Sequence, residues 1–181
     1  SVLLMVSLLA LSCSRSSDQV TSEEGTQKAV SGRHPMVLLV MDGVRVDHVG
    51  AYGADVSATP NLDAFASGAI RFDWAFAQAP DATASLASLL TGLYPTTHGL
   101  VEGDDRLVDE AVTLAETLAD ASLTPAAFLT SAAAFTERGL EQGFEIFATG
   151  PEALDEAAQW IAQNAETDFF LVVEVGSVDP A

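Results

Sequence analysis

Residues 36–41, with the sequence MVLLVM, form an unbroken apolar run that stops at Asp42 and Gly43. A run of this length is typical of a strand that is buried on both faces, as in a parallel sheet. Apolar runs at residues 126–129 and 169–173 predict two more strands of the same kind. We expect the strand that ends at Asp42 to lie in the middle of the sheet, with the other two beside it.

Helical patterns separate these runs, and they cover residues 60–67, 85–92, 111–121 and 151–165. Thr59 and Pro60 are typical of the cap and first position of a helix, and Gly68 is typical of a left-handed cap at its end. We expect residues 70–76 to be extended. Strands that alternate with helices predict an α/β fold with a mainly parallel central sheet flanked by helices.

The composition is that of one globular domain with an acidic surface. Of the 181 residues, 49% are hydrophobic and 18% are charged. The chain has 26 acidic side chains against 7 Lys and Arg, which gives a net charge of −19. This charge argues against electrostatic binding of DNA, RNA or an anionic membrane surface. An anionic substrate would need a metal ion and a few arginines to reverse the field locally.

The N-terminal segment has the pattern of an exported protein. Residues 1–12 predict a signal peptide, because their apolar part is about half of the ~20 residues that a membrane-spanning helix needs. The sequence LALSC at residues 9–13 resembles a bacterial lipobox, which implies lipid attachment at Cys13. Cys13 is the only cysteine, so no intrachain disulfide can form. An ordinary signal peptide that happens to contain a cysteine is the alternative.

These patterns divide the chain into three parts. Residues 13–32 are polar and without a period, as expected of a flexible tether, and the folded domain covers residues 33–181. A lipid on Cys13 would place the protein in the bacterial cell envelope, at the outer membrane or the periplasmic face. The protein would then contact the membrane through its N-terminal lipid.

Asp42 is the first candidate for a chemical role. Ligands of open α/β sheets bind at the carboxyl ends of strands, and a carboxylate there can coordinate a divalent cation. An Asp-Gly pair is also a common turn, so position alone leaves both roles open.

Four motifs follow one another along the chain. They are LLVMDGVRVDHVGAYG from Leu38, TPNLDAFASGAIRF from Thr59, AQAP from Ala77 and ASLLTGLYPTTHG from Ala87. Together they resemble the N-terminal part of sulfatases, in the alkaline-phosphatase superfamily, which carry strings such as TPNLDRLAAEGVRF and CxPSRASLLTGxYPxxHG. GLEQGF at residues 139–144 and FFL at residues 169–171 extend the resemblance toward Ala181. The expected fold is therefore alkaline-phosphatase-like, and we interpret the chain as truncated.

The resemblance implies a mechanism. Sulfatases hydrolyse sulfated esters, and relatives act on phosphorylated esters. One or two Asp after the first strand hold a divalent metal, most often Ca²⁺ and in relatives Mg²⁺, Mn²⁺ or Zn²⁺, which assigns Asp42 to the metal. A Cys or Ser at a helix N-terminus becomes formylglycine and attacks sulfur. Further metal ligands come from a later motif, typically SDHG, which this sequence lacks.

The nucleophile motif departs from the family pattern. A gap-free alignment places Ala82 at the nucleophile, Ala84 at the motif's Pro and Leu86 at its Arg, and retains Ser85. A methyl group cannot attack sulfur or become formylglycine. Thr83 is the nearest hydroxyl and the one remaining candidate for a catalytic residue, although we favour a helix-cap or loop role for it. Ser85 is expected to cap the helix, and the residues that bind the anion stay unassigned.

Other positions depart as well. Gly43 replaces the frequent second Asp, and no Lys stands near Thr130 and Ser131, where many members have one. His98 and His48 are expected to make structural hydrogen bonds. Arg45 is expected to form a structural ion pair.

Two functions remain open at this point. By resemblance the chain is a metal-dependent sulfuric ester hydrolase, and because of Ala82 it is expected to be inactive in this form. The alternatives are a lipid-anchored, non-catalytic pseudo-sulfatase that binds a carbohydrate or a protein, a phosphoryl-transfer relative, and a decayed gene fragment.

Overall fold

A four-stranded parallel sheet forms the centre of the molecule. The computed structural model describes residues 35–54, 58–131 and 137–176. The strands are β1 (Met36–Met41), β2 (Thr124–Leu129), β3 (Ile146–Thr149) and β4 (Phe169–Val175), in the order β1-β4-β2-β3, and all three pairings are parallel. The predicted α/β fold with a mainly parallel sheet is confirmed.

The predicted place of β1 in this sheet is wrong. Within the described sheet, β1 lies at an edge, and β4 lies between β1 and β2. Burial gives the reason, because six of the seven residues of β4 are buried whereas Val37 of β1 is 42% exposed. An apolar run identifies a buried strand, but it does not give the order of neighbouring strands.

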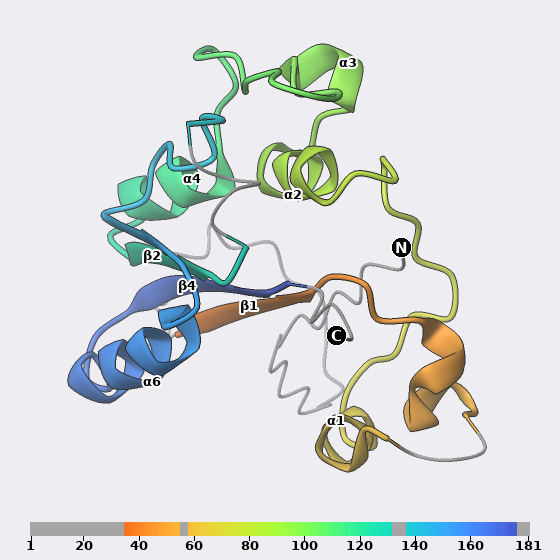
Figure 1. Ribbon diagram of the computed structural model, residues 1–181. Helices are drawn as coiled ribbons and strands as arrows, with labels where there is room; N and C mark the ends of the chain where they lie inside the picture. The colour runs from red at the N-terminus through yellow and green to blue at the C-terminus, as the bar shows by residue number, and fades with distance from the viewer. Residues whose placement is uncertain (1–34, 55–57, 132–136, 177–181) are drawn as a thin grey trace, which may run out of the picture.

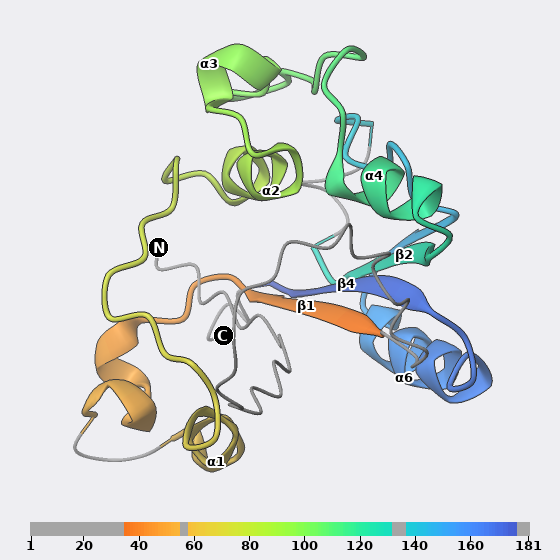
Figure 2. The same cartoon turned by 180° about the vertical axis from the view of Figure 1, so that it is seen from behind.

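The helices form two layers, one on each face of the sheet. In Figures 1 and 2, α2 (Ala82–Thr91) and α4 (Leu114–Asp120) lie on one face and α6 (Ala153–Gln163) lies on the other. The short helices η1 (Val46–His48), η2 (Gly50–Tyr52) and α1 (Pro60–Ala66) lie beyond the carboxyl end of β1, and α3 (Pro95–His98) packs on α2.

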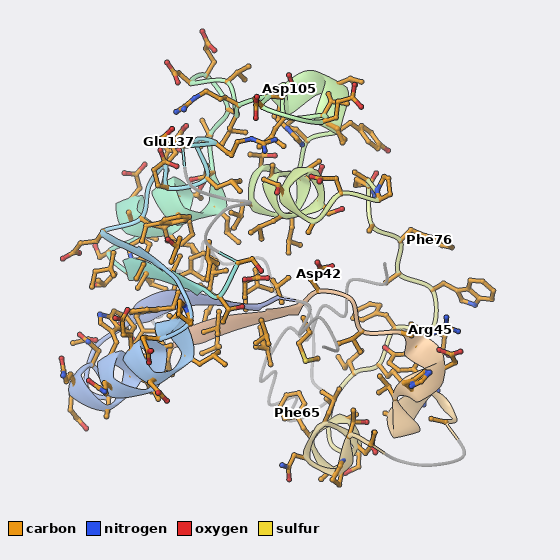
Figure 3. The ribbon with its side chains drawn as sticks, viewed as in Figure 1. Asp42, Arg45, Phe65, Phe76, Asp105 and Glu137 are labelled. Atoms are coloured by element: carbon orange, nitrogen blue, oxygen red, sulfur yellow. The ribbon has the colours of Figure 1, made fainter. Side chains whose placement is uncertain are left out.

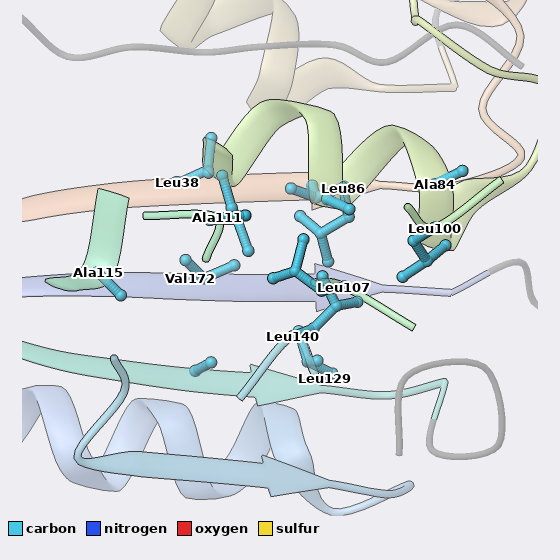
Figure 4. Close-up of a cluster of buried hydrophobic side chains, with 14 of the residues drawn as sticks. Leu38, Ala84, Leu86, Leu100, Leu107, Ala111, Ala115, Leu129, Leu140 and Val172 are labelled. Carbon is cyan, nitrogen blue, oxygen red and sulfur yellow. The ribbon is translucent and has the colours of Figure 1, made fainter. Parts of the chain in front are cut away.

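Two hydrophobic clusters fill the space between these layers. The larger cluster joins α2 and α4 to the sheet, and its members include Leu38, Val40, Leu86, Leu129, Phe170 and Val172 (Figure 4). The smaller cluster joins α6 to the other face of the sheet. In it, the centroid of the Trp160 ring lies 5.1 Å from that of Phe169 and 6.2 Å from that of Phe128. Alternate residues of each strand therefore point into different clusters, as the pleat requires.

Two helices begin at other residues than predicted. Helix α2 begins at Ala82, three residues before the predicted start, because the Asp81 side chain caps it. Helix α4 begins at Leu114 rather than at residue 111, because Thr113 and Glu116 form a reciprocal capping box. In both cases the capping side chain sets the boundary.

The end of α1 and the strand β3 also differ from the prediction. Helix α1 ends at Ala66, followed by Ser67 in the right-handed region, and Gly68 does not have a positive φ. Strand β3 was not predicted, since its four residues are half-buried or exposed and form no long apolar run.

Candidate functional site

The carboxyl ends of the parallel strands place three polar residues at one edge of the sheet. Asp42 follows β1 directly, Glu174 lies near the end of β4, and Ser131 lies two residues after β2. The pairing continues past β1, where the Asp42 N–H donates to the Val175 carbonyl oxygen at 2.9 Å. By alternation from Val40 and Val172, the side chains of Asp42 and Glu174 lie on the face that α2 covers.

Asp42 is half-buried, and its carboxylate already has a local partner. Its Oδ1 accepts from the Gly43 N–H at 2.8 Å, and Figure 3 shows the residue at the end of β1. Among residues 35–54, 58–131 and 137–176, no three His, Cys, Asp or Glu side chains form a group that could hold a metal ion. Ca²⁺ takes six to eight oxygen ligands, so the described residues alone do not fit a calcium site. The assignment of Asp42 to a metal stays a prediction.

Glu174 is a buried carboxylate that the sequence did not single out. It is 1% exposed and accepts from the Ser131 N–H at 3.1 Å, the Ser131 hydroxyl at 3.0 Å and the Thr130 hydroxyl at 3.4 Å. Thr130 Oγ1 accepts in turn from the Gly176 N–H at 2.6 Å. These bonds satisfy the carboxylate and tie the segment after β2 to the end of β4.

The N-terminus of α2 is closed by a carboxylate of the chain itself. Asp81 Oδ1 accepts from the Ala84 N–H at 2.8 Å, and Ala82, the first helical residue, is half-buried. Free N–H groups at a helix N-terminus are what would favour a bound anion. Here the Asp81 carboxylate takes one of these groups and adds a negative charge.

The hydroxyl groups in the first turn of α2 are buried. Ser85 is 5% exposed and its hydroxyl donates to the Ala79 carbonyl oxygen at 2.6 Å. The expectation that Ser85 caps the helix is therefore wrong, because Asp81 occupies that role. Thr83 is 3% exposed at the second helical position, and its candidacy as a nucleophile stays a prediction.

Leu86 occupies a position in the hydrophobic core. It is 2% exposed and belongs to the larger cluster, between α2 and the sheet (Figure 4). A guanidinium at this position would lie among aliphatic side chains rather than beside a substrate.

His98 makes the structural hydrogen bonds that were expected of it. The ring is fully buried, its Nδ1 accepts from the Leu100 N–H at 3.2 Å, and its Nε2 lies 3.0 Å from Ser88 Oγ. Because Nδ1 is an acceptor, the neutral ring carries its proton on Nε2 and donates to Ser88. Burial lowers the pKa of His98 below its ordinary value.

The remaining candidates are exposed. Arg45 Nη2 lies 2.6 Å from Asp47 Oδ2, with side chains 73% and 56% exposed, which confirms the expected ion pair. The hydrogen bond from Arg45 lowers the pKa of Asp47. His48 Nε2 lies 4.0 Å from Asp47 Oδ1. Cys13 lies outside the described residues, and no helix in the described part of the chain is long and apolar enough to cross a membrane.

The sequence pattern of one protein family, named Sulfatase, matches residues 35–160. The chain belongs to the sulfatase family. Three sulfatases among its relatives are an arylsulfatase of Clostridium perfringens (39% identical over 70 residues), human arylsulfatase A (37% over 97) and an ulvan-active sulfatase of Formosa agariphila (35% over 115). These matches cover 39%, 50% and 64% of this chain, but the chain spans only 15–22% of the length of these relatives.

Solved structures confirm the sulfatase fold. A protein in complex with its substrate D-glucosamine-2-N,6-O-disulfate superposes on this chain with a TM-score of 0.67 at 17% sequence identity. The superposed part is 79% of this chain and 34% of that protein's chain. The phosphonate monoester hydrolase of Agrobacterium radiobacter superposes with a TM-score of 0.65 at 20% sequence identity, over 81% of this chain and 42% of the hydrolase chain. The fold is alkaline-phosphatase-like, and the neighbours contain a large part that this chain does not match.

We predict that Leu86→Arg destabilises the protein and does not create an anion site. An unpaired charge in the larger cluster should lower the free energy of unfolding by about 3–5 kcal/mol. Leu154→Arg, on the exposed side of α6 where Leu154 is 43% exposed, is the matched control and should change it by less than about 0.5 kcal/mol. Urea denaturation measures both. Equal stability of the two variants, with saturable sulfate binding by Leu86→Arg, would contradict the assignment.

We also predict that His98 makes the protein less stable in mild acid. His98 has a lowered pKa when folded, whereas in the unfolded chain it titrates near 6.5. As the pH falls below that value, the unfolded state binds a proton that the folded state does not bind. Stability should therefore fall from about pH 7 to pH 5.5, by at most about 1.4 kcal/mol per pH unit.

The test compares two histidine variants over this pH range. His98→Gln should be less stable at pH 7, because the bonds to Ser88 and Leu100 are disturbed, but its stability should depend less on pH. His48→Gln, at an exposed position, is the matched control for the loss of one histidine. A His98→Gln variant that retains the full slope would show that another group is responsible.

Proposed function

We propose that the chain forms the N-terminal part of a sulfated-ester hydrolase and that it has no catalytic activity by itself. Membership of the sulfatase family supports the first statement. The second rests on one observation, the N-terminus of α2. The sequence resemblance aligns Ala82 with the nucleophile, and Asp81 caps the helix where an anion would bind.

The substrate class follows from the relatives. One structural neighbour holds a sulfated glucosamine as its substrate, and the relatives include arylsulfatases and an ulvan-active sulfatase. We propose the same substrate class, a sulfated ester, for the whole domain of which this chain would be part. A phosphoryl-transfer activity is the second candidate, and the shared fold of a phosphonate monoester hydrolase favours it.

The expected loss of catalytic rate is large. Loss of one electrostatic donor to a transition state typically costs about 10²–10³ in rate, and loss of a nucleophile costs more. This chain would lack both, because Ala82 has no nucleophilic atom and Leu86 is in the core. We propose Asp42 as a single metal ligand, with Ca²⁺ as the expected ion from family resemblance. One carboxylate would hold it no more tightly than about the millimolar range of the weakest natural calcium sites.

We therefore predict no turnover of p-nitrophenyl sulfate or bis-p-nitrophenyl phosphate with added Ca²⁺, Mn²⁺ or Zn²⁺. Calorimetric titration with Ca²⁺ should show no binding tighter than about 1 mM. Asp42→Ala serves as the matched control. It should also show no turnover, and any weak Ca²⁺ binding by the wild type should be weaker still in this variant. Metal-dependent turnover that Asp42→Ala abolishes would contradict the proposal, and it would make Thr83 the first nucleophile to test by Thr83→Val.

We further propose that a lipid on Cys13 anchors the protein in the bacterial cell envelope. The apolar segment before Cys13 and the lipobox-like sequence at residues 9–13 support this proposal. The tether of residues 13–32 would then separate the membrane from the folded domain.

Cys13→Ala should move the protein from the membrane fraction to the soluble fraction of a bacterial host, since lipid attachment needs the thiol. Fractionation followed by immunoblotting measures this distribution. Wild-type chain grown with a labelled fatty acid should carry the label, and the variant should not. Membrane pelleting that is unchanged in the variant would refute the anchor.

A further inference from the structure

Residues 70–76 carry a row of large apolar side chains that face solvent. Ile70, Phe72, Trp74 and Phe76, here called the aromatic strip, are 77%, 56%, 83% and 76% exposed. The Trp74 and Phe76 rings stack, with centroids 6.3 Å apart and planes at 27°. Single exposed apolar residues need no explanation, but a contiguous row of this size marks an interaction surface.

The aromatic strip has the pattern of a β-strand but lacks a partner strand. Its apolar residues recur with period two, and aromatic residues favour strands. No backbone N–H of residues 70–78 donates to a backbone oxygen of any described residue. Side chains donate to two of its carbonyl oxygens, Tyr52 to Phe72 and Gln78 to Phe76. Backbone N–H groups without a backbone partner are a template for pairing with another strand.

Side chains hold the aromatic strip in place. Arg71 Nη1 donates to the Ala51 carbonyl oxygen at 2.6 Å, and its guanidinium lies 5.5 Å from the centre of the Tyr52 ring. The Tyr52 hydroxyl donates to the Phe72 carbonyl oxygen at 3.2 Å. The segment is thus fixed in an extended course between α1 and α2, and Figure 3 shows Phe76 on the outer flank, away from the sheet.

We propose that the aromatic strip is the surface on which the C-terminal part of a sulfatase-family domain docks, by adding a strand to it. The strip pairs through its backbone N–H and C=O groups, and its four side chains pack against apolar side chains of that part. This proposal concerns assembly and is independent of whether the assembled domain is an enzyme.

The size of the structural neighbours identifies the occupant. About four fifths of this chain superpose on each neighbour, but they match only 34% and 42% of the neighbours' own chains. More than half of each neighbour's chain thus lies outside the superposed part, and any of it that belongs to the same domain must pack on a surface of that part. The aromatic strip is exposed and apolar, and its backbone N–H groups have no backbone partner among the described residues, as expected of such a surface.

Charge argues against the other polypeptide occupant, a second copy of this chain. Each copy carries a net charge of −19, so the association of two copies is opposed by repulsion at low ionic strength. A sugar as occupant would use the ring faces but would leave the backbone groups of residues 70–76 without partners.

The test uses the 181-residue chain and one defined probe. The probe is the ulvan-active sulfatase of Formosa agariphila without the stretch that matches this chain and everything before it, expressed in the same cells. We expect a 1:1 complex in analytical ultracentrifugation. Hydrogen exchange should show slowed amides at residues 71–76 in the complex and fast exchange of the same amides in the chain alone.

Two double variants separate docking from folding. Trp74→Ser with Phe76→Ser should weaken probe binding about tenfold or more, and should leave the melting temperature of the chain alone unchanged because both rings are exposed. Val112→Ser with Leu154→Ser removes side chains that are 64% and 43% exposed elsewhere, and it should bind the probe like the wild type. The intact relative, which contains its own N-terminal part, should not bind.

Several results would overturn the proposal. One is the absence of a complex, and another is a complex in which residues 71–76 stay unprotected or which the Trp74→Ser/Phe76→Ser variant forms equally well. A homodimer of the chain that this variant abolishes would identify a second copy as the occupant. Protection of residues 71–76 by ulvan without the probe would identify a carbohydrate.

Discussion

The parallel pairing of β4 with β1 on one side and β2 on the other is the interaction on which the rest of the structure depends. Six of the seven residues of β4 are buried, between α6 on one face and the α2–α4 layer on the other. A parallel sheet is typically covered by helices on both faces, and its strands are then apolar along their whole length. The same pairing brings the ends of β1, β2 and β4 to one edge, and thereby places Asp42, Ser131 and Glu174 at that edge.

At this edge and at the N-terminus of α2, the chain satisfies its own polar groups. Asp81 binds the N–H of Ala84, and Glu174 binds the backbone and hydroxyl of Ser131. Leu86, which the sequence resemblance aligns with an arginine of the family motif, adds apolar contacts. Each of these contacts stabilises the fold. The hydrogen bonds of Asp81 and Glu174 also occupy donor groups that could otherwise bind an anion. The α2 N-terminus therefore acts as a structural element, which is the physical basis for the proposed lack of activity.

The sequence predicted the elements better than their arrangement. MVLLVM and FFLVV are long apolar runs, and both are strands, whereas their order in the sheet depends on contacts between segments more than 120 residues apart in sequence. The start of α2 was missed because Asp81, Thr83 and Ser85 can all cap a helix, and only the structure shows which side chain binds the free N–H. Glu174 was missed because its partner Ser131 is 43 residues away in sequence. The burial of Leu86 was not inferred either, although its apolar side chain within a helix of small residues was a signal.

Titration with inorganic sulfate, followed by the backbone amide resonances of Ala82, Thr83 and Ala84, tests the central claim most directly. If the Asp81 carboxylate closes the N-terminus of α2, these resonances should not move in a saturable manner at concentrations up to about 10 mM, which corresponds to less than about 3 kcal/mol of binding free energy. Saturable shifts of these amides with a Kd below about 1 mM would show that the helix still binds an anion, and would contradict the account.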